Sequence, residues 1–301
     1  MKTFIMILSL MLMPVLGFSS INSVASLSNP ITNSSFSARA ASMGSAFVAV
    51  ADDSSALYWN PAGLGTLSVQ ELAYHHDSWL ADISQDTVVL GFPSKNLGGF
   101  GLSFDYTNYG TFPGYTDIGV KTNDYSANNY GLDLGWGKQF KKFDFGFALK
   151  QNTYNIAGMS YSAFAGDIGA LWSASDKLRF GVAYTNIGTK VDGYSQASDL
   201  RLGSSYTIQS KNNKLLLAAD GVIEQQGVNR IQLGAEDTLY SHLALRVGYN
   251  LPLAETDLQG LDNLTAGVGI IINNLYFDYA YVPFGDLGVA NKISLSYKWG
   301  K

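Results

Sequence analysis

The sequence predicts an all-β protein: a closed transmembrane antiparallel β-barrel of about fourteen strands. Three observations lead to this fold class. Apolar and polar residues alternate from residue 68 almost to the end, the connections between the alternating segments are short and long in turn, and the composition is unusual. The chain has 32 Gly, 18 Tyr and 16 Phe but only 14% charged residues, against roughly 25% in soluble domains.

The first twenty residues have the layout of a secretory signal peptide. Lys2 supplies an early positive charge, residues 4–18 are almost wholly apolar, and Gly17, Ser19 and Ser20 are small residues suited to cleavage. The alternative is a membrane-anchoring helix, but the apolar run is shorter than the roughly 20 residues that a span needs. We therefore predict a signal peptide over residues 1–20 and no transmembrane helix in the mature chain.

The alternation with period two identifies the strands, because successive side chains of a strand point to opposite faces. Residues 143–150 show it clearly, with Phe, Phe, Phe and Leu alternating with Asp, Gly, Ala and Lys. Fourteen such segments begin near residues 68, 84, 98, 125, 143, 161, 177, 198, 213, 228, 242, 263, 274 and 290. They place the barrel over residues 68–301.

The connections indicate which kind of barrel this is. Short ones fall at residues 93–97, 141–142, 174–176, 210–212, 240–241 and 273–274. Longer or polar ones tend to fall between them, at residues 108–124, 187–197, 251–262 and 283–290. Tight turns at one end and long loops at the other are typical of outer-membrane barrels. The expected location is therefore the bacterial outer membrane, with outer-membrane lipid as a partner.

The two faces of the strands differ in a way that suits lipid. One face carries large apolar side chains, while the other carries small residues and charges of both signs, as a crowded lumen would. In a soluble periplasmic β-domain, which is the alternative, charges would dominate the polar face. Only a closed barrel satisfies every backbone polar group of strands in lipid. The predicted luminal charges are Asp105, Asp133, Lys150, Asp167, Arg179, Arg201, Asp220, Arg230, Glu236, Arg246 and Asp278.

Residues 21–67 precede the barrel and do not alternate. They hold many small residues, and the lumen of a fourteen-stranded barrel is the expected place for them. At their end lies YWNPAGLGTL, residues 58–67. Pro61 disfavours helix at Asn60, Gly63 is expected to permit a reversal, and the two leading aromatic residues are expected to anchor the turn. Whether this motif is a plain turn or also has a gating role stays open at this stage.

The string SARAASMGSAFVAVADDSSALYWNPAGL, residues 37–64, resembles the N-terminal signature of the PorV/PorQ family of outer-membrane proteins, within the FadL-like group that shares the NPAG motif. Further matches are HHDSWLADIS (75–84), YSAFAGDIGALW (161–172), NIGTK (186–190) and FGDLGVANKISLSYKWG (284–300). The chain departs from such barrels at its end, where Gly300 and Lys301 follow the aromatic Trp299.

This resemblance implies a fourteen-stranded barrel whose N-terminal segment, residues 21–67, folds into the lumen as a hatch. The residues expected to form the hatch and its turn are Arg39, Met43, Phe47, Asp52, Asp53, Trp59, Asn60, Pro61 and Gly63. The luminal charges have two open interpretations. They hold the hatch or line a passage, or they neutralise one another across the wall.

No catalytic or cofactor motif is found in the sequence, so we expect neither an enzyme nor a bound cofactor. Cysteine is absent, and there is no Gly-x-Ser-x-Gly elbow. The adjacent His75 and His76 would face opposite ways on a strand and could not share a metal ion. The glycine runs at 98–101 and 135–138 lack nucleotide-loop spacing and indicate close backbone approach instead. The net charge of −5 argues against a nucleic-acid binder.

Two functions follow from the resemblance. The first is a channel for hydrophobic or amphipathic small molecules, gated by the hatch. Apolar positions on the inner face, expected at Phe164, Leu171, Leu216, Val222 and Ile271, would suit such a ligand or the packing of the hatch. The second is a non-enzymatic adaptor that binds secreted or secretion-system proteins, as in type IX secretion. Its contact surface would be the loop at 108–124, with Phe112, Tyr115 and Tyr125.

Overall fold

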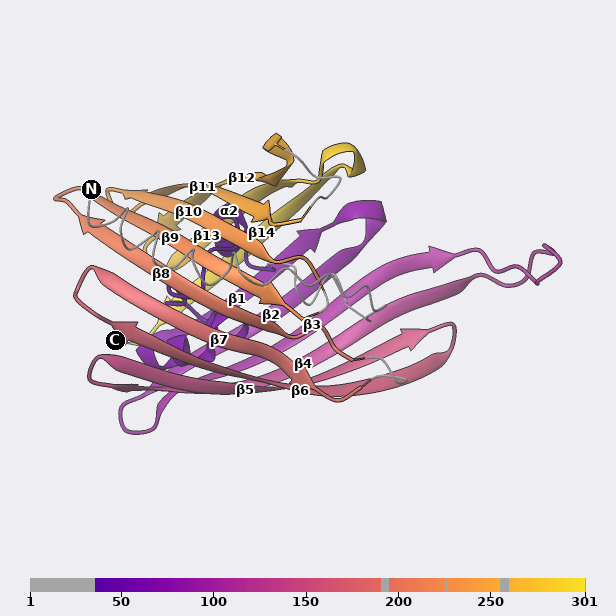
Figure 1. Ribbon diagram of the computed structural model, residues 1–301, viewed down its shortest axis with the longest axis horizontal. Helices are drawn as coiled ribbons and strands as arrows, with labels where there is room; N and C mark the ends of the chain where they lie inside the picture. The colour runs from indigo at the N-terminus through magenta and orange to yellow at the C-terminus, as the bar shows by residue number, and fades with distance from the viewer. Residues whose placement is uncertain (1–35, 191–194, 226, 255–259, 301) are drawn as a thin grey trace.

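The computed structural model describes residues 36–190, 195–225, 227–254 and 260–300. The predicted signal peptide (1–20) and residues 21–35 of the predicted hatch lie outside these ranges. The described residues form a closed barrel of fourteen antiparallel strands (Figure 1). The strands are β1 (Gln70–Ser78), β2 (Ser84–Ser94), β3 (Gly98–Phe112), β4 (Tyr125–Phe140), β5 (Phe143–Ile156), β6 (Met159–Ser173), β7 (Leu178–Gly188), β8 (Asp199–Gln209), β9 (Asn213–Glu224), β10 (Arg230–Leu239), β11 (Leu243–Pro252), β12 (Leu264–Ile272), β13 (Leu275–Pro283) and β14 (Val289–Trp299).

Each strand pairs with its neighbours in sequence, and the barrel closes where β1 pairs with β14. In that last pairing Gln70 lies opposite Trp299 and Ser78 lies opposite Asn291. Every strand begins within two residues of the position that the alternation predicted. The predicted fold class and strand number are therefore confirmed, because the period of two is visible in the sequence wherever the two faces of a strand meet different surroundings.

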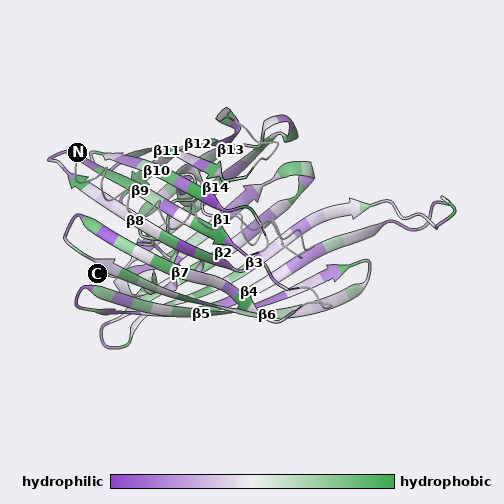
Figure 2. Ribbon diagram, in the orientation of Figure 1, coloured by the Kyte–Doolittle hydropathy of each residue, from purple (hydrophilic) through white to green (hydrophobic). Residues whose placement is uncertain are grey.

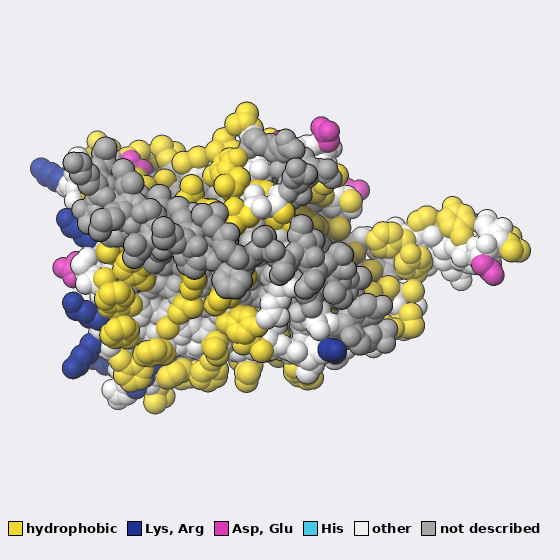
Figure 3. All heavy atoms as spheres, in the orientation of Figure 1, with side chains coloured by type: hydrophobic (Ala, Val, Ile, Leu, Met, Phe, Trp, Pro, Cys, Tyr) yellow, Lys and Arg dark blue, Asp and Glu magenta, His cyan; other side chains and the backbone are white. Residues whose placement is uncertain are grey.

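The outward face of the strands is apolar and exposed. Along β4 and β5 the exposed side chains include Leu132, Leu134, Phe145, Phe147 and Leu149, while the residues between them are mostly buried. Figure 2 shows the resulting bands of opposite hydropathy, and Figure 3 shows apolar side chains over much of the visible outer surface. A soluble β-domain would bury such residues. The protein is thus a lipid-embedded barrel of the bacterial outer membrane, as predicted.

The two ends of the barrel differ in their connections. The end that carries Trp299 has only short turns in the described chain, such as residues 95–97 and 141–142. The opposite end carries the longer connections, and the hairpin of β3 and β4 extends farthest beyond it (Figure 1). The loop at 108–124 was predicted too long, because β3 continues to Phe112 past a β-bulge. The hairpin of β5 and β6 also turns at this end in only two residues, 157–158.

Residues 36–67, called the N-terminal segment below, lie within the barrel. They contain α2 (Ala38–Ser42), α3 (Ala56–Trp59) and η2 (Pro61–Thr66). Helix α2 contacts β11 to β14, whereas η2 contacts β2 to β6 across the lumen. Three further short helices lie in the long connections: η3 (Leu80–Asp82), η4 (Gly260–Asn263) and η5 (Gly285–Leu287). Among the residues described, no helix is long and apolar enough to cross a membrane.

The side chains of the N-terminal segment form the core of the molecule. Phe47, Met43, Leu57 and Leu64 are its largest fully buried side chains. One cluster joins Met43 and Phe47 to Leu216 of β9, and a second joins Leu57 and Leu64 to Val89 of β2. The segment therefore packs against opposite sides of the barrel wall. This packing brings its polar groups within reach of the charges on the inner face.

Candidate functional site

Asn60, the first residue of the NPAG motif, joins the N-terminal segment to the wall. Its side-chain nitrogen Nδ2 is a donor 3.2 Å from the carbonyl oxygen of Ala170 on β6 and 3.3 Å from that of Val182 on β7. The same nitrogen lies 3.1 Å from the carbonyl oxygen of Val48 in the segment itself. Asn60 is completely buried. The side chain thus holds three backbone stretches together at one point.

Asn60 also begins the helix that follows. Its backbone is extended, its side-chain oxygen accepts a hydrogen bond from the N–H of Ala62 at 3.2 Å, and Pro61 occupies the first position of η2. This is the arrangement that the proline predicts. The reversal expected at Gly63 is wrong, because its φ is not positive and it lies inside η2. Glycine is required there for another reason: a Cβ would overlap the carbonyl oxygen of Ala51.

The two aromatic residues before Asn60 contact polar groups of the wall. The hydroxyl of Tyr58 donates to Oγ of Ser103 at 2.6 Å, and Lys150 Nζ lies 5.5 Å above the Tyr58 ring. The guanidinium of Arg201 lies 5.3 Å above the Trp59 ring. Such cation–aromatic contacts are attractive, especially away from water. Burial, reinforced by nearby carboxylates, raises the pKa of Tyr58 well above its ordinary value, so its hydroxyl remains a donor.

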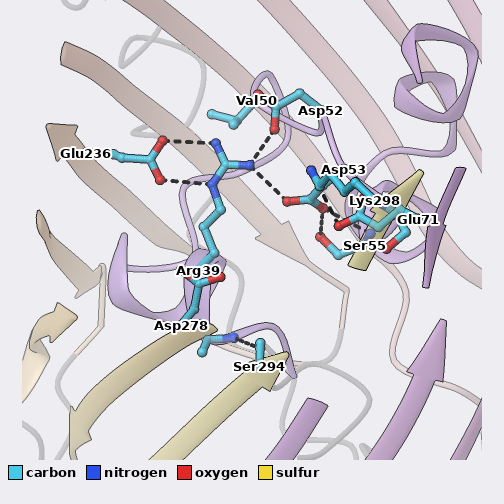
Figure 4. A network of polar contacts seen from close by, with 12 residues as sticks. Arg39, Val50, Asp52, Asp53, Ser55, Glu71, Glu236, Asp278, Ser294 and Lys298 are labelled. Carbon is cyan, nitrogen blue, oxygen red and sulfur yellow. Dashed lines mark hydrogen bonds and ion pairs between the residues drawn. The ribbon is translucent and has the colours of Figure 1, made fainter. Parts of the chain in front are cut away.

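Arg39 makes the principal ionic contact between the segment and the wall (Figure 4). Its Nε and Nη2 lie 2.9 and 3.0 Å from the two carboxylate oxygens of Glu236 on β10. Its Nη1 lies 2.6 Å from Asp52 and 2.9 Å from Asp53 of the segment itself. Burial disfavours the charge on Arg39, but the three carboxylates outweigh it and raise the pKa of Arg39 well above its ordinary value. The Arg39 guanidinium therefore keeps its charge.

The ionic network continues along the wall on both sides of Arg39. Glu236 also accepts from Nε of Arg246 at 2.6 Å, and Nη1 of Arg246 lies 2.6 Å from Asp278 on β13. At β1, the N–H of Ser54 donates to Glu71 at 2.8 Å. A buried ion pair loses about 3–5 kcal/mol when one partner is removed, because the other charge stays buried and uncompensated. These contacts therefore favour one position of the segment.

Glycines of the wall let the segment approach the strands directly. A Cβ at Gly137 would lie 2.5 Å from the carbonyl oxygen of Pro61, and one at Gly181 would lie 2.6 Å from that of Val48. At Gly234 the overlap would be with Met43. Gly99, Gly146 and Gly248 face the segment in the same way. The interpretation of the glycine runs at 98–101 and 135–138 as sites of close backbone approach is confirmed.

The predicted luminal charges lie on the inner face of the barrel. Most are buried, and Arg230, at the long-loop end, has the most exposed side chain of those in ion pairs, at 40%. Lys150 lies 2.7 Å from Asp167, which was also predicted. Three others pair with acids that the sequence analysis had not singled out: Arg201 lies 2.8 Å from Asp199, Arg179 lies 3.5 Å from Asp144, and Arg230 lies 3.4 Å from Glu224.

Some of these charges contact the segment, and others only the wall. Asp220 accepts from the N–H of Val48 at 2.9 Å, and Arg179 donates to the carbonyl oxygen of Val50 at 2.9 Å. The residues missed by sequence reasoning also include Glu71, Asp77, Lys292 and Lys298. The alternation along β1 and β14 places these four residues on the inward face, and this could have identified them from the sequence. Some luminal charges therefore contact the N-terminal segment, and others pair with each other within the wall.

The apolar positions expected on the inner face are only partly there. Leu171, Leu216 and Val222 are buried, and Ile271 has the same inward parity in β12. Phe164 was predicted wrongly: its side chain is 55% exposed on the outer face. It alternates with the buried Ala163 and Ala165, so its parity in β6 is that of the lipid-facing residues.

The adjacent histidines point to opposite faces, as the period of two predicts. His75 is buried with Nδ1 2.7 Å from Oγ of Ser294, whereas Nδ1 of His76 lies 2.7 Å from Asp86. They do not share a ligand. Among the described residues, no group of three metal-ligand side chains is placed to hold an ion.

Solved structures with a similar fold include a toluene transporter and two monoaromatic hydrocarbon channels. The toluene transporter TbuX of Ralstonia pickettii gives a TM-score of 0.62 at 13% identity, covering 88% of this chain and 98% of that one. The monoaromatic hydrocarbon channel CymD gives 0.61 at 12%, with coverages of 94% and 100%. A deltaS2 mutant of the monoaromatic hydrocarbon channel TodX gives 0.63 at 13%, with coverages of 88% and 99%. At these identities the similarity establishes the fold.

The comparisons of sequence give fewer matches than those of structure. No curated protein matches the chain. The resemblance to the PorV/PorQ family therefore stays a prediction. One family model does match, over residues 33–219, which span the whole N-terminal segment and strands β1 to β8. Because this is more than half of the sequence, the chain belongs to the uncharacterised protein family UPF0164.

Proposed function

We propose that the barrel passes hydrophobic small molecules across the outer membrane and that the N-terminal segment acts as a hatch in its lumen. The observation that carries this proposal is the position of the segment: it is buried and contacts strands on opposite sides of the lumen. The three similar structures belong to a toluene transporter and to monoaromatic hydrocarbon channels. They support the same class of solute for this chain.

The contacts of the segment suit a hatch that can be displaced. It is a continuous chain with little regular structure, joined to β1 at one end. Its apolar cluster of Met43, Phe47 and Trp59 with Leu216 provides surface that an apolar solute can cover once the segment moves. The ionic contacts of Arg39 return it to one position. A solute would thus exchange apolar contacts for apolar contacts, which limits the free-energy cost of opening.

The experiment is a flux assay with the purified protein in liposomes whose outer leaflet is lipopolysaccharide, which toluene crosses slowly. Toluene is the apolar probe, arabinose the polar one, and protein-free liposomes give the baseline that is subtracted from each flux. The wild type is expected to pass toluene and to retain arabinose. Deletion of residues 21–57 is expected to let both through, because most of the segment that fills the lumen is then removed. If the wild type passes no toluene and the deletion changes neither flux, the proposed function is wrong. Heat-dependent gel mobility verifies that each variant forms the barrel.

A second candidate function is that of a non-enzymatic adaptor in type IX secretion, as the resemblance to the PorV/PorQ family implies. One observation favours it. The tip of the β3–β4 hairpin projects beyond the barrel and exposes Tyr115, Ile118 and Val120, with 61%, 83% and 56% of their surface accessible. Below it the rings of Phe112 and Tyr125 stack with centroids 5.5 Å apart.

A pull-down distinguishes the two candidates. If the protein is an adaptor, a secreted or secretion-system protein co-purifies with it. Replacing residues 113–124 with a two-residue turn then abolishes this binding while toluene flux is unchanged. If no such protein is retained by the wild type, the adaptor role is rejected. Absence of other type IX secretion components from the genome would count against it independently.

A further inference from the structure

A cavity of about 360 Å³ lies at the short-turn end of the barrel, against the N-terminal segment. Ala49, Val50 and Asp52 of the segment form one side of it. The turns between β4 and β5 and between β6 and β7, together with parts of β7, β8 and β9, form the rest. The cavity therefore lies between the N-terminal segment and the rim of one end of the lumen, and it is open to solvent on one side. Two of its lining residues, Val50 and Leu216, also belong to the apolar cluster around Met43 and Phe47, so the cavity borders that cluster.

The lining of this cavity is strongly basic. It contains five cationic side chains, from three separate stretches of the wall, and two carboxylates, Asp52 and Asp176; the cations are Lys141, Lys142, Lys177, Arg179 and Lys214. Figure 3 shows Lys and Arg side chains gathered at the same end of the molecule. A concave site with one sign of charge concentrates ions of the opposite sign. The positive excess is larger than the two carboxylates can neutralise.

Several of these cations have donors to spare. Arg179 uses Nη1 to bind the carbonyl oxygen of Val50, and its Nη2 lies 3.5 Å from Asp144, beyond good hydrogen-bond distance. Its Nε and Nη2 have no hydrogen-bond partner among the described residues. Lys141, Lys142 and Lys177 form no ion pair with any part of the chain that the structure describes. The three lysines are exposed, whereas the two unpaired Arg179 nitrogens are buried. Buried donors without partners are costly, and a ligand that accepts hydrogen bonds would relieve those of Arg179.

The remaining polar groups of the lining are hydroxyls. Ser173, Ser175, Ser205 and Thr207 all border the cavity. Hydroxyls, ammonium groups and a guanidinium are the donors that bind tetrahedral or planar oxyanions. We propose that this cavity is a binding site for an oxyanion of the phosphate class. Either a soluble phosphate ester or the anionic headgroup of a lipid can supply that group.

This site goes beyond the proposed passage of hydrophobic molecules, because equilibrium binding requires no movement of the hatch and no flux. The proposal also predicts that substitutions of opposite charge in the lining change the anion affinity in opposite directions. Asp176 lies in the exposed β6–β7 turn and lines the cavity, so its charge opposes an anion there. Removing that charge must tighten binding, whereas removing lysines must weaken it. A merely structural role of these residues would not give effects of opposite sign.

The binding experiment uses the full chain in a neutral detergent, with inorganic pyrophosphate as the probe, measured by calorimetry at low ionic strength. Saturable binding to one site is expected. Lys142→Gln with Lys177→Gln lowers the affinity about tenfold, and Asp176→Asn raises it about threefold, as Coulomb interactions at a partly screened site imply. The matched control is Lys95→Gln with Lys211→Gln. These two lysines lie in other short turns at the same end and do not line the cavity.

The outcomes separate the site from general attraction. The proposal is overturned if the wild type binds no pyrophosphate, or if the control pair lowers the affinity as much as the cavity pair. To find the source of the anion, the measurement is repeated in nanodiscs. Pyrophosphate binding that is displaced by phosphatidylglycerol, but not by phosphatidylcholine, assigns the site to a lipid headgroup. Equal binding in both assigns it to a soluble phosphate ester. Flux of toluene is measured separately, so failure of the anion site leaves the proposed function untouched.

Discussion

Arg39 and Glu236 form a two-pronged ion pair between the N-terminal segment and β10, with nitrogen–oxygen distances of 2.9 and 3.0 Å. The two residues are 197 positions apart in the sequence. Glu236 is shared with Arg246 of the neighbouring strand, so the carboxylate is already held in place by the wall. The segment therefore binds to a prepared site, and this contact is expected to control how often the lumen opens.

Removing the carboxylate tests that control. Glu236→Gln leaves two arginines close together with less compensation, and we expect it to weaken the seating of the segment by about 3 kcal/mol. Arabinose should then leak through the barrel in the liposome assay. Arg230→Gln is the control, because the Arg230–Glu224 pair is more exposed, with a nitrogen–oxygen distance of 3.4 Å, and should contribute about 1 kcal/mol or less. Equal leakage from the two variants would refute the assignment.

Asn60 separates the two interpretations of the NPAG motif. Asn60→Ser keeps an oxygen that can cap η2, but its shorter side chain cannot donate to the carbonyl oxygens of Ala170 and Val182. If the wall contacts matter, hydrogen exchange of residues 48–62 should accelerate about as much in Asn60→Ser as in Asn60→Ala. Each lost hydrogen bond accounts for about 1 kcal/mol. Wild-type exchange in Asn60→Ser would instead identify the motif as a plain turn.

The wall glycines make a steric prediction. Gly181→Ala places a methyl group 2.6 Å from the carbonyl oxygen of Val48, so the segment must shift. Overpacking of this kind costs about 1–3 kcal/mol, and arabinose leakage should rise. Gly166→Ala is the matched control on β6, where the nearest atom is 3.3 Å from the added carbon and does not belong to the segment. Leakage from the Gly166 variant alone would show that the barrel wall, not the segment, limits flux.

The lipid-facing side is tested by placing a lysine at two positions, one within the membrane-spanning part of a strand and one in a turn at the barrel end. Leu149→Lys puts a charge on the exposed face of β5, and we expect it to lower the free energy of unfolding in lipid by about 2–4 kcal/mol. Leu97→Lys introduces the same charge in the β2–β3 turn, where Leu97 is also exposed. There the expected change is near zero. Urea unfolding in phosphocholine vesicles measures both, and similar losses would contradict the assignment of the outer face.

The barrel was predictable from the sequence because its signal is local. Each strand repeats the same alternation, and the turns between strands are visible as polar gaps, so every strand start was found within two residues. Phe164 was assigned to the wrong face because the prediction did not apply the alternation along β6. Ala163 and Ala165 point inward, so Phe164 between them points outward. Asn60 and Pro61 were found because proline restricts its neighbours in any context.

The contacts of the site were not predictable in the same way. Arg39 and Glu236 were each singled out, but nothing local pairs residues so distant in the chain. Register between the segment and the wall is set by the backbone contacts at Gly137, Gly181 and Gly234, and a sequence reveals the glycines without their partners. The basic cavity likewise assembles lysines from turns that are neighbours only once the barrel closes.

The most direct measurement compares the oxidised and reduced forms of one double-cysteine variant. The chain has no cysteine, and a Cβ at Gly91 of β2 would lie 3.1 Å from that of Ser54 in the segment, close to the spacing of a disulfide. Ser54→Cys with Gly91→Cys therefore ties the segment to the wall when oxidised. We predict that toluene flux stops in the oxidised protein and returns on reduction, while the wild type responds to neither treatment. Equal flux in the oxidised and reduced forms would contradict the hatch.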